Sequence, residues 1–135
     1  MVNQERRKAK LRPLVWDERL AALARAHSLD MQKQNYFAHE APDGETLADR
    51  AARSGLTYTR LGENLAFAHD LQAAHRGLMK SPGHRANILR PEFRRLGVGI
   101  IRLPANTRYH PQVEGQSLPP AKLGGYLLVT QVFAS

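Results

Sequence analysis

Three side chains in the middle of the chain have the chemistry of a shared polar site. His39 lies in an irregular FAHEAPDG stretch, Glu63 lies in GENLA, and His84 lies in SPGHR. A neutral imidazole can bind a metal ion or accept a proton, and a carboxylate can do the same. The spacings along the chain match no local metal-binding motif. Tertiary structure must therefore bring the three residues together if they share a site.

The residues beside Glu63 and His84 have structural interpretations of their own. Pro82 is favoured at the first position of a helix, so SPGHR predicts a short helix with His84 in its first turn. The positive end of that helix disfavours a protonated imidazole, so we expect His84 to be neutral. Ser81 is interpreted as a helix cap, because SPGHR is not the G-x-S-x-G motif of a nucleophilic serine. Asn64 is expected to satisfy backbone groups of a turn.

The other four histidines have structural interpretations that require no functional site. His27 and His75 each lie on an apolar helical face, where a hydrogen-bonded and partly buried ring is expected. His69 and His110 are expected in loops. The chain has no cysteine, which excludes disulfides, cysteine-ligated zinc and a cysteine nucleophile.

Helices dominate the first half of the chain. A first helix is predicted over residues 3–10, and three later helices begin at the capping residues Asp17, Thr46 and Asp70. Asp49 lies three residues after Thr46, which is the spacing of a capping box. The fifth helix is the short one that begins at SPGHR.

The second half of the chain is rich in strands. Residues 96–101 and 126–133 are predicted strands, and residues 61–67 are expected to form a third. Between the first two, the Pro- and Gly-rich residues 103–125 predict a long loop that is most mobile from about 104 to 124. Helices followed by strands predict an α+β fold with an antiparallel sheet.

The predicted core draws on both halves of the chain. Leu128 and Val129 are neighbours on the last strand, so both are buried only if helices cover both faces of the sheet. The core is expected to contain Leu20, Leu23, Met31, Val98, Ile100, Leu128, Val129 and Val132.

Composition indicates a basic globular domain. The 135 residues are 42% hydrophobic and carry a net charge of +8, which predicts one domain over residues 1–135. The net charge indicates anionic surroundings, a membrane or a cell wall, and the alternative is a solvated surface that only keeps the protein soluble. The densest basic cluster runs from Arg6 to Arg12. No recognition-helix, RNP or zinc-finger pattern accompanies the charge, so specific nucleic-acid binding is not expected.

The order of the motifs along the chain is similar to that of a known protein family. LVWDERLAALARAHSLDM, FAHEAPDG, GENLA, LMKSPGHRANIL, GVGI and VTQVF follow one another from about residue 3 to residue 133. In this order they resemble the bacterial, cysteine-free branch of the CAP superfamily, also called SCP-like. The resemblance implies an α-β-α sandwich with a small antiparallel sheet between helical layers. It also implies an extracellular or cell-surface location, with a leader that this sequence does not include.

The same resemblance implies a central cavity with two histidines and two glutamates. His39, Glu63 and His84 match three of them, and Ser81 stands where the second glutamate is expected. The cavity is then expected to be lined by His39, Glu63, His84, Ser81 and Asn64. His39, His84 and Glu63 would bind a divalent metal such as zinc. Binding would be weak, because Ser81 replaces a carboxylate.

Function is expected to be ligand binding, with two alternatives open. The favoured hypothesis is a monomeric, secreted module that binds a small molecule, a lipid or a cell-wall component. One alternative is a metal-assisted hydrolase using His39, Glu63 and His84, since a catalytic zinc needs three protein ligands and a water. If Glu63 is a ligand, no clear general base remains, and if Glu63 is the base, only two protein ligands remain. This count of ligands disfavours an enzyme. The other alternative is adhesion through the basic surface.

Overall fold

A computed structural model describes residues 1–111 and 123–135. The helices are α1 (Val2–Lys8), α2 (Glu18–Gln34), α3 (Leu47–Arg53), α4 (Leu71–Lys80) and α5 (Pro82–Ile88). The strands are β1 (Val15–Trp16), β2 (Leu61–Ala68), β3 (Arg95–Arg102) and β4 (Leu127–Ala134). Among the described helices, none is long and apolar enough to cross a lipid bilayer.

The sheet has the strand order β1-β3-β4-β2. The central strand β4 pairs antiparallel with both β2 and β3, as the sequence predicted. The two-residue strand β1 was not predicted, and it pairs parallel with β3. The sheet is therefore mixed at one edge rather than antiparallel throughout. Two residues are too few for a hydrophobic alternation to reveal a strand.

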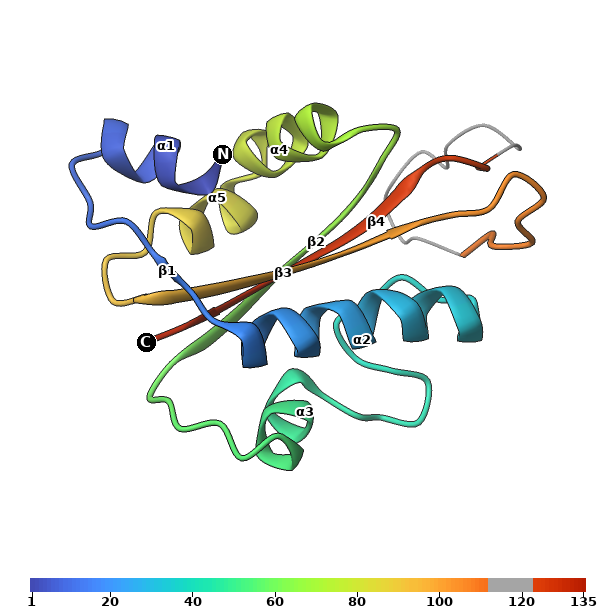
Figure 1. The fold of residues 1–135 in the computed structure, drawn as a ribbon, viewed down its shortest axis with the longest axis horizontal. Coiled ribbons are helices and arrows are strands. Elements are labelled where there is room, and N and C mark those ends of the chain that lie inside the picture. Colours follow the sequence, from blue (N-terminus) through green and yellow to red (C-terminus); the bar gives the residue numbers. More distant parts are fainter. Residues whose placement is uncertain (112–122) are drawn as a thin grey trace.

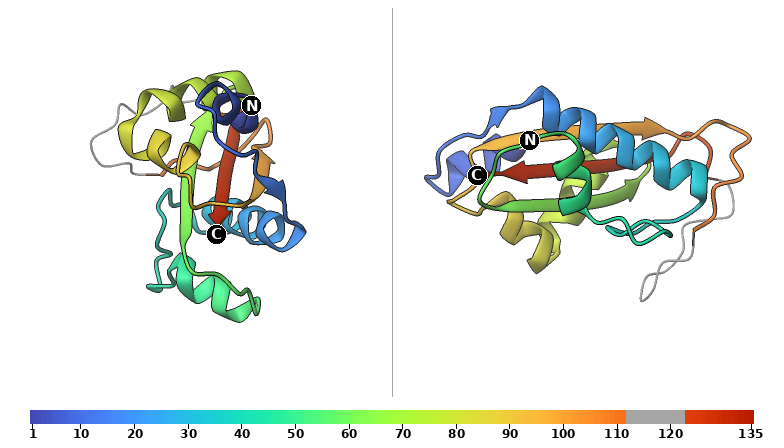
Figure 2. Two further views of the ribbon diagram at one scale, coloured as in Figure 1. Left: turned by 90° about the vertical axis from the view of Figure 1, so that its left-hand side faces the viewer. Right: turned by 90° about the horizontal axis from the view of Figure 1, so that it is seen from below.

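Helices cover both faces of this sheet. One layer holds α2 and α3, and the opposite layer holds α1, α4 and α5 (Figure 1; Figure 2). Leu128 and Val129 are both buried although they point to opposite faces. The α-β-α sandwich expected from the sequence is confirmed.

Predicted caps fix where the helices begin. The Asp17 side chain accepts hydrogen bonds from the backbone amides of Arg19 and Leu20, at 2.8 and 3.2 Å. Thr46 and Asp49 form the expected capping box at the start of α3, and Asp70 accepts from the Ala73 amide. These local bonds satisfy amides that the first turn of a helix leaves free.

Two glycines let α2 lie directly against β3. A Cβ atom at Gly97 would come within 2.0 Å of the Ala21 backbone nitrogen, and one at Gly99 within 2.1 Å of the Arg25 nitrogen. Val98 and Ile100 alternate with these glycines and so face the opposite layer. There Val98 is only half-buried and Ile100 is 41% exposed, so the prediction that Ile100 belongs to the core is wrong. The six other predicted core residues are buried.

The segments flanking residues 112–122 belong to the core. Leu103, Tyr109 and Leu123 are buried together with Met31 and Leu128. The prediction of a long irregular connection therefore missed two anchoring segments. The part of the mobility prediction that falls on residues 112–122 lies outside the described residues.

Candidate functional site

The predicted site residues lie on or beside β2, an edge strand of the sheet. Glu63 and Asn64 are neighbours on this strand, so their side chains point to opposite faces. Glu63 faces the layer of α2 and α3, where it contacts Arg50 and His39. Asn64 faces α5 and contacts His84. The predicted residues therefore form two hydrogen-bonded groups at the β2 edge, and the groups are close enough for the charge of His39 to act on His84.

Glu63 is the centre of the first group. Its side chain is 2% exposed, and its two oxygens accept hydrogen bonds from Arg50 of α3, at 2.9 and 3.2 Å. His39 Nδ1 lies 2.9 Å from the same carboxylate, and the buried His27 lies 4.0 Å away. Burial opposes ionisation of Glu63, but the hydrogen bonds from His39 and Arg50 outweigh it and lower its pKa. Glu63 is therefore an ionised carboxylate with a hydrogen bond to each oxygen.

The carboxylate orients the ring of His39. An ionised carboxylate only accepts hydrogen bonds, so Nδ1 of His39 carries the proton that it donates to Glu63. Nε2 of His39 is the ring nitrogen that makes no bond to Glu63, on a side chain that is 58% exposed. Arg50 also donates to the backbone oxygen of His39, at 3.0 Å.

Sequence reasoning missed Arg50, although a signal for it exists. Arg50 follows Leu47 by one helical turn and precedes the buried Ala51, so it lies beside the apolar stripe of α3. A cation in that position needs a buried anion. Glu63 is that anion, and the ion pair holds α3 against β2.

Ser81 and His84 form the second group. His84 Nδ1 lies 2.8 Å from Ser81 Oγ. Burial and, second, the charge of His39 lower the pKa of His84, which supports the expected neutral ring by causes other than the helix end. Ser81 occupies the capping position of α5, but its side chain makes no capping bond. The hydroxyl is directed to His84 instead.

Asn64 does not satisfy a turn, contrary to the sequence interpretation. It lies within β2, and its amide nitrogen donates to the His84 backbone oxygen at 3.0 Å and to Gln131 at 3.1 Å. Its oxygen accepts from Asn87 of α5 at 2.9 Å. Asn64 therefore fastens α5 to the sheet. The surrounding GENLA segment contains no turn, because the whole segment pairs with β4.

The donor atoms do not fit a zinc centre. A zinc ion in proteins takes at least three protein ligands. Both oxygens of Glu63 are bonded, and the Arg50 guanidinium would repel a cation there. Across residues 1–111 and 123–135, no three His, Asp or Glu side chains are grouped so that they could hold a metal ion. Weak zinc binding stays a prediction.

The remaining histidines on helices, His27 and His75, lie near polar groups of the fold. His27 is buried on α2 and its Nε2 lies 2.9 Å from the Ala38 oxygen, as the sequence analysis expected. His75 is half-buried on α4, with Nε2 3.4 Å from Glu5. Nδ1 of His75 is buried without a hydrogen-bond partner among the described residues.

An apolar groove, which the sequence did not predict, lies on the α1–α4 side of the sheet. Its volume is about 280 Å³. Trp16 at its rim is 51% exposed, and Met1, Leu71 and Ile100 are also large, exposed apolar residues. The groove is lined by Met1, Val2, Asn3, Trp16, Leu71, Ala74, His75, Leu78, Leu96, Val98, Ile100, Val129 and Gln131.

The chain is similar to proteins of one known family. A family model described as the cysteine-rich secretory protein family, CAP, matches residues 1–113. The chain belongs to the CAP family. The match confirms the family that the motif order indicated.

Two relatives of this CAP domain come from Bacillus subtilis (strain 168). The uncharacterized protein YkwD is 40% identical over 102 residues, which are 75% of this chain and 40% of the relative. The uncharacterized membrane protein YlbC is 37% identical over 103 residues, which are 76% of this chain and 30% of the relative. The CAP domain thus spans less than half the length of the curated relatives that it matches.

Solved structures share the fold. An extracellular protein containing an SCP domain from Bacillus anthracis has a TM-score of 0.75 and 34% identity, over 98% of this chain and 37% of that chain. An outer surface protein from Borrelia burgdorferi has a TM-score of 0.78 and 16% identity, over 99% of this chain and 86% of that chain. These structural relatives are extracellular or surface proteins.

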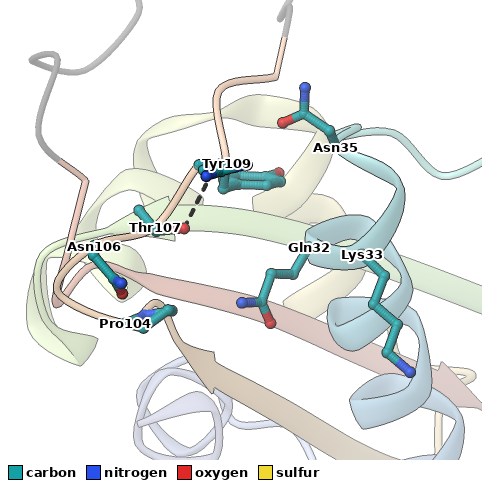
Figure 3. A pocket seen from close by; sticks show the side chains of 8 residues that line it. Gln32, Lys33, Asn35, Pro104, Asn106, Thr107 and Tyr109 are labelled. Carbon is teal, nitrogen blue, oxygen red and sulfur yellow. Dashed lines mark hydrogen bonds between the residues drawn. The ribbon is translucent and has the colours of Figure 1, made fainter.

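A further hollow of the CAP domain lies at the C-terminal end of α2. Its volume is about 360 Å³, and Figure 3 shows its polar side chains, with Gln32 and Lys33 on α2 and Asn106 and Thr107 on the segment after β3. The Tyr109 backbone nitrogen donates to Thr107 at 3.2 Å, which holds this segment in place. None of the predicted site residues lines this hollow.

Proposed function

We propose that this CAP domain is an extracellular module that binds a single-chain amphipathic lipid, such as a fatty acid. The ligand lies in the apolar groove between α1, α4 and the sheet. The observation that carries the proposal is the gathering of Met1, Trp16, Leu71 and Ile100 at the rim of one hollow. Exposed apolar residues that converge on a concave surface are typical of binding sites.

The groove fits an acyl chain in size and chemistry. A volume of about 280 Å³ is close to the lower end of small-molecule pockets. Each methylene removed from water contributes about 0.8 kcal/mol, so a partly inserted chain gains several kcal/mol. Val98 and Val129 supply the apolar floor on the sheet, and Ala74 leaves room on α4.

Polar side chains that line the groove suit the polar head group of an amphipathic lipid. His75 lines the groove, and its buried Nδ1 has no partner in the described part of the chain. Asn3 and Gln131 also line it. A hydroxyl or carboxyl group of the ligand would lie closest to these polar side chains of the lining.

The groove supports binding better than the predicted His/Glu cavity does. Both oxygens of Glu63 are already bonded, and Nδ1 of His84 lies against Ser81. A ligand at Glu63 would have to displace the buried Arg50. The names of the solved relatives support a place outside the cell or at its surface.

Trp16 provides a direct test, because it is the only tryptophan of the chain and lies at the groove. A fatty acid brominated on its acyl chain is expected to quench Trp16 fluorescence in a saturable way. Ile100→Glu, which places a charge at the rim, should weaken binding at least about tenfold.

Leu29→Glu is the matched control for this test. Leu29 is another exposed large apolar residue, but it lies on α2 and does not line the groove. The control should bind like the unchanged protein. Absence of quenching, or equal weakening in both variants, would contradict the proposal.

A further inference from the structure

Arg6 is buried without an acidic partner in the described part of the chain. It lies in α1, is 0% exposed, and is one of the largest fully buried side chains. Its guanidinium donates to four backbone oxygens, those of Arg12 at 2.8 Å, Ile88 and Arg90 at 2.9 Å, and Phe93 at 3.4 Å. These carbonyls satisfy its hydrogen bonds but do not neutralise its charge.

The electrostatics at Arg6 reflect this lack of an anion. Its pKa is lowered by burial and, second, by the positive charge of Arg94. Among the described residues, no acidic group contributes to that shift. A guanidinium stays charged in proteins, so a fixed positive charge lies beneath this part of the surface.

Arg6 joins two chain segments that enclose a hollow of about 440 Å³. One segment is the turn after α1, and the other connects α5 to β3. We call this hollow the basic hollow. It is lined by Lys10, Leu11, Arg12, Pro91, Glu92 and Arg94.

The basic hollow has an excess of unpaired cations. Lys10, Arg12 and Arg94 are exposed, and within residues 1–111 and 123–135 none of them is in an ion pair. The one acidic side chain in the lining, Glu92, lies 3.9 Å from Arg90 Nε. With Arg6 beneath, four positive charges surround the hollow and one negative charge lines it.

We propose that the basic hollow binds a phosphate ester group. Guanidinium groups match phosphate oxygens in geometry, and an ammonium adds a further donor and charge. A phosphate would also relieve the repulsion between Arg94 and the buried Arg6. This site is separate from the apolar groove, because no residue lines both.

The local backbone holds the rim of the basic hollow in a defined shape. Lys10 adopts a left-handed conformation with φ of 60°, which is uncommon outside glycine. Its amide donates to the Arg7 oxygen at 3.0 Å, and the Leu11 amide donates to the Arg6 oxygen at 2.8 Å. The backbone of the rim therefore loses little conformational entropy when an anion binds.

A titration with glycerol 3-phosphate at low salt tests the site. In ¹⁵N–¹H correlation spectra, the amides of residues 10–12 and 92–94 are expected to shift and saturate. Arg12→Gln and Arg94→Gln should each weaken binding about three- to fivefold, the range of a single exposed charge. Glu92→Gln should strengthen binding about twofold, because it removes the one repelling charge.

Arg25→Gln is the matched control, because it removes the same charge from α2 on the opposite layer. It should leave the affinity unchanged. Shifts spread evenly over the basic surface, or equal weakening by Arg25→Gln and Arg12→Gln, would overturn the proposal. Arg6 itself is not substituted in this test, because its loss is expected to unfold the region.

A second arm identifies the source of the phosphate. Sedimentation uses phosphatidylcholine vesicles with and without about one-third phosphatidylglycerol, at low and high salt. Binding to the anionic vesicles that Arg12→Gln weakens and Arg25→Gln retains assigns a lipid headgroup. Saturable glycerol 3-phosphate binding without vesicle binding assigns a soluble phosphate ester. Either result is independent of the fatty-acid test at the apolar groove.

Discussion

The two faces of the same sheet are packed in different ways. On the α2 face, Gly97 and Gly99 bring the helix backbone against the strand. On the opposite face, Val98 and Ile100 of the same strand border an apolar groove. The alternation of small and large residues along β3 therefore decides which face is closed and which is open.

Polar groups are buried on both faces. The α2 face buries a Ser28–Thr130 hydroxyl pair at 2.7 Å and the Glu63–Arg50 ion pair. Each face leaves one buried side-chain nitrogen without a partner among the described residues, Arg50 Nε on the α2 side and His75 Nδ1 on the other. The two faces therefore differ in packing rather than in polar pairing: the closely packed face is structural, and the open apolar groove is suited to binding.

The largest expected effect comes from filling the space between α2 and β3. Gly99→Ala should lower the free energy of unfolding by about 4 kcal/mol, because the new Cβ would collide with backbone of α2. Gly77→Ala on α4 is the matched control. Apart from its chain neighbours and the backbone of its own helix, no described atom lies within 4 Å of the added Cβ there, so better helix propensity should raise stability by about 0.5–1 kcal/mol. Urea denaturation measures both; equal effects would show that α2 can shift to accept the methyl group.

The next effect concerns the buried ion pair. Glu63→Gln should lower the free energy of unfolding by about 3 kcal/mol, because it leaves the buried Arg50 without its anion. Glu40→Gln makes the same chemical change at an exposed position next to His39 and should be nearly neutral. A small loss in Glu63→Gln would show that the backbone bond of Arg50 to His39 is sufficient for the guanidinium.

Local sequence signals predicted much of the fold. Asp17, Thr46 and Asp70 begin helices as expected, because a cap depends on residues within one turn. The three long strands could be predicted from runs of β-branched and apolar residues. Strand β1 was not visible, because its two residues are defined by pairing with Arg95 and Leu96.

The candidate site was less predictable, because it depends on which face each side chain points to. The neighbours Glu63 and Asn64 were grouped together, but β2 sends them to opposite faces. The role of Arg50 depends on α3 lying against β2. The apolar groove combines α1, β1, α4 and two central strands, and no single segment of sequence contains its pattern.

The smallest effect is expected in the pH dependence of stability. Burial is the main cause that lowers the pKa of His27, and the nearby charge of Arg50 adds to it against the opposing effect of Glu63. The unfolded chain, whose histidines titrate near 6.5, then binds more protons than the folded chain. Stability should therefore fall as pH drops from about 7.5 through 6.5 towards the lower folded pKa. His27→Gln retains a donor for the Ala38 oxygen and should flatten this slope.

His84→Gln makes the comparison between the two faces quantitative. The pKa of His84 is also lowered, but its ring is half-buried whereas His27 is buried. Low pH should therefore reduce stability mainly through His27 on the α2 face. His27→Gln should flatten the slope of stability against pH more than His84→Gln does. Urea denaturation at several pH values measures both variants, and a larger effect of His84→Gln would place the acid sensitivity at the edge near α5.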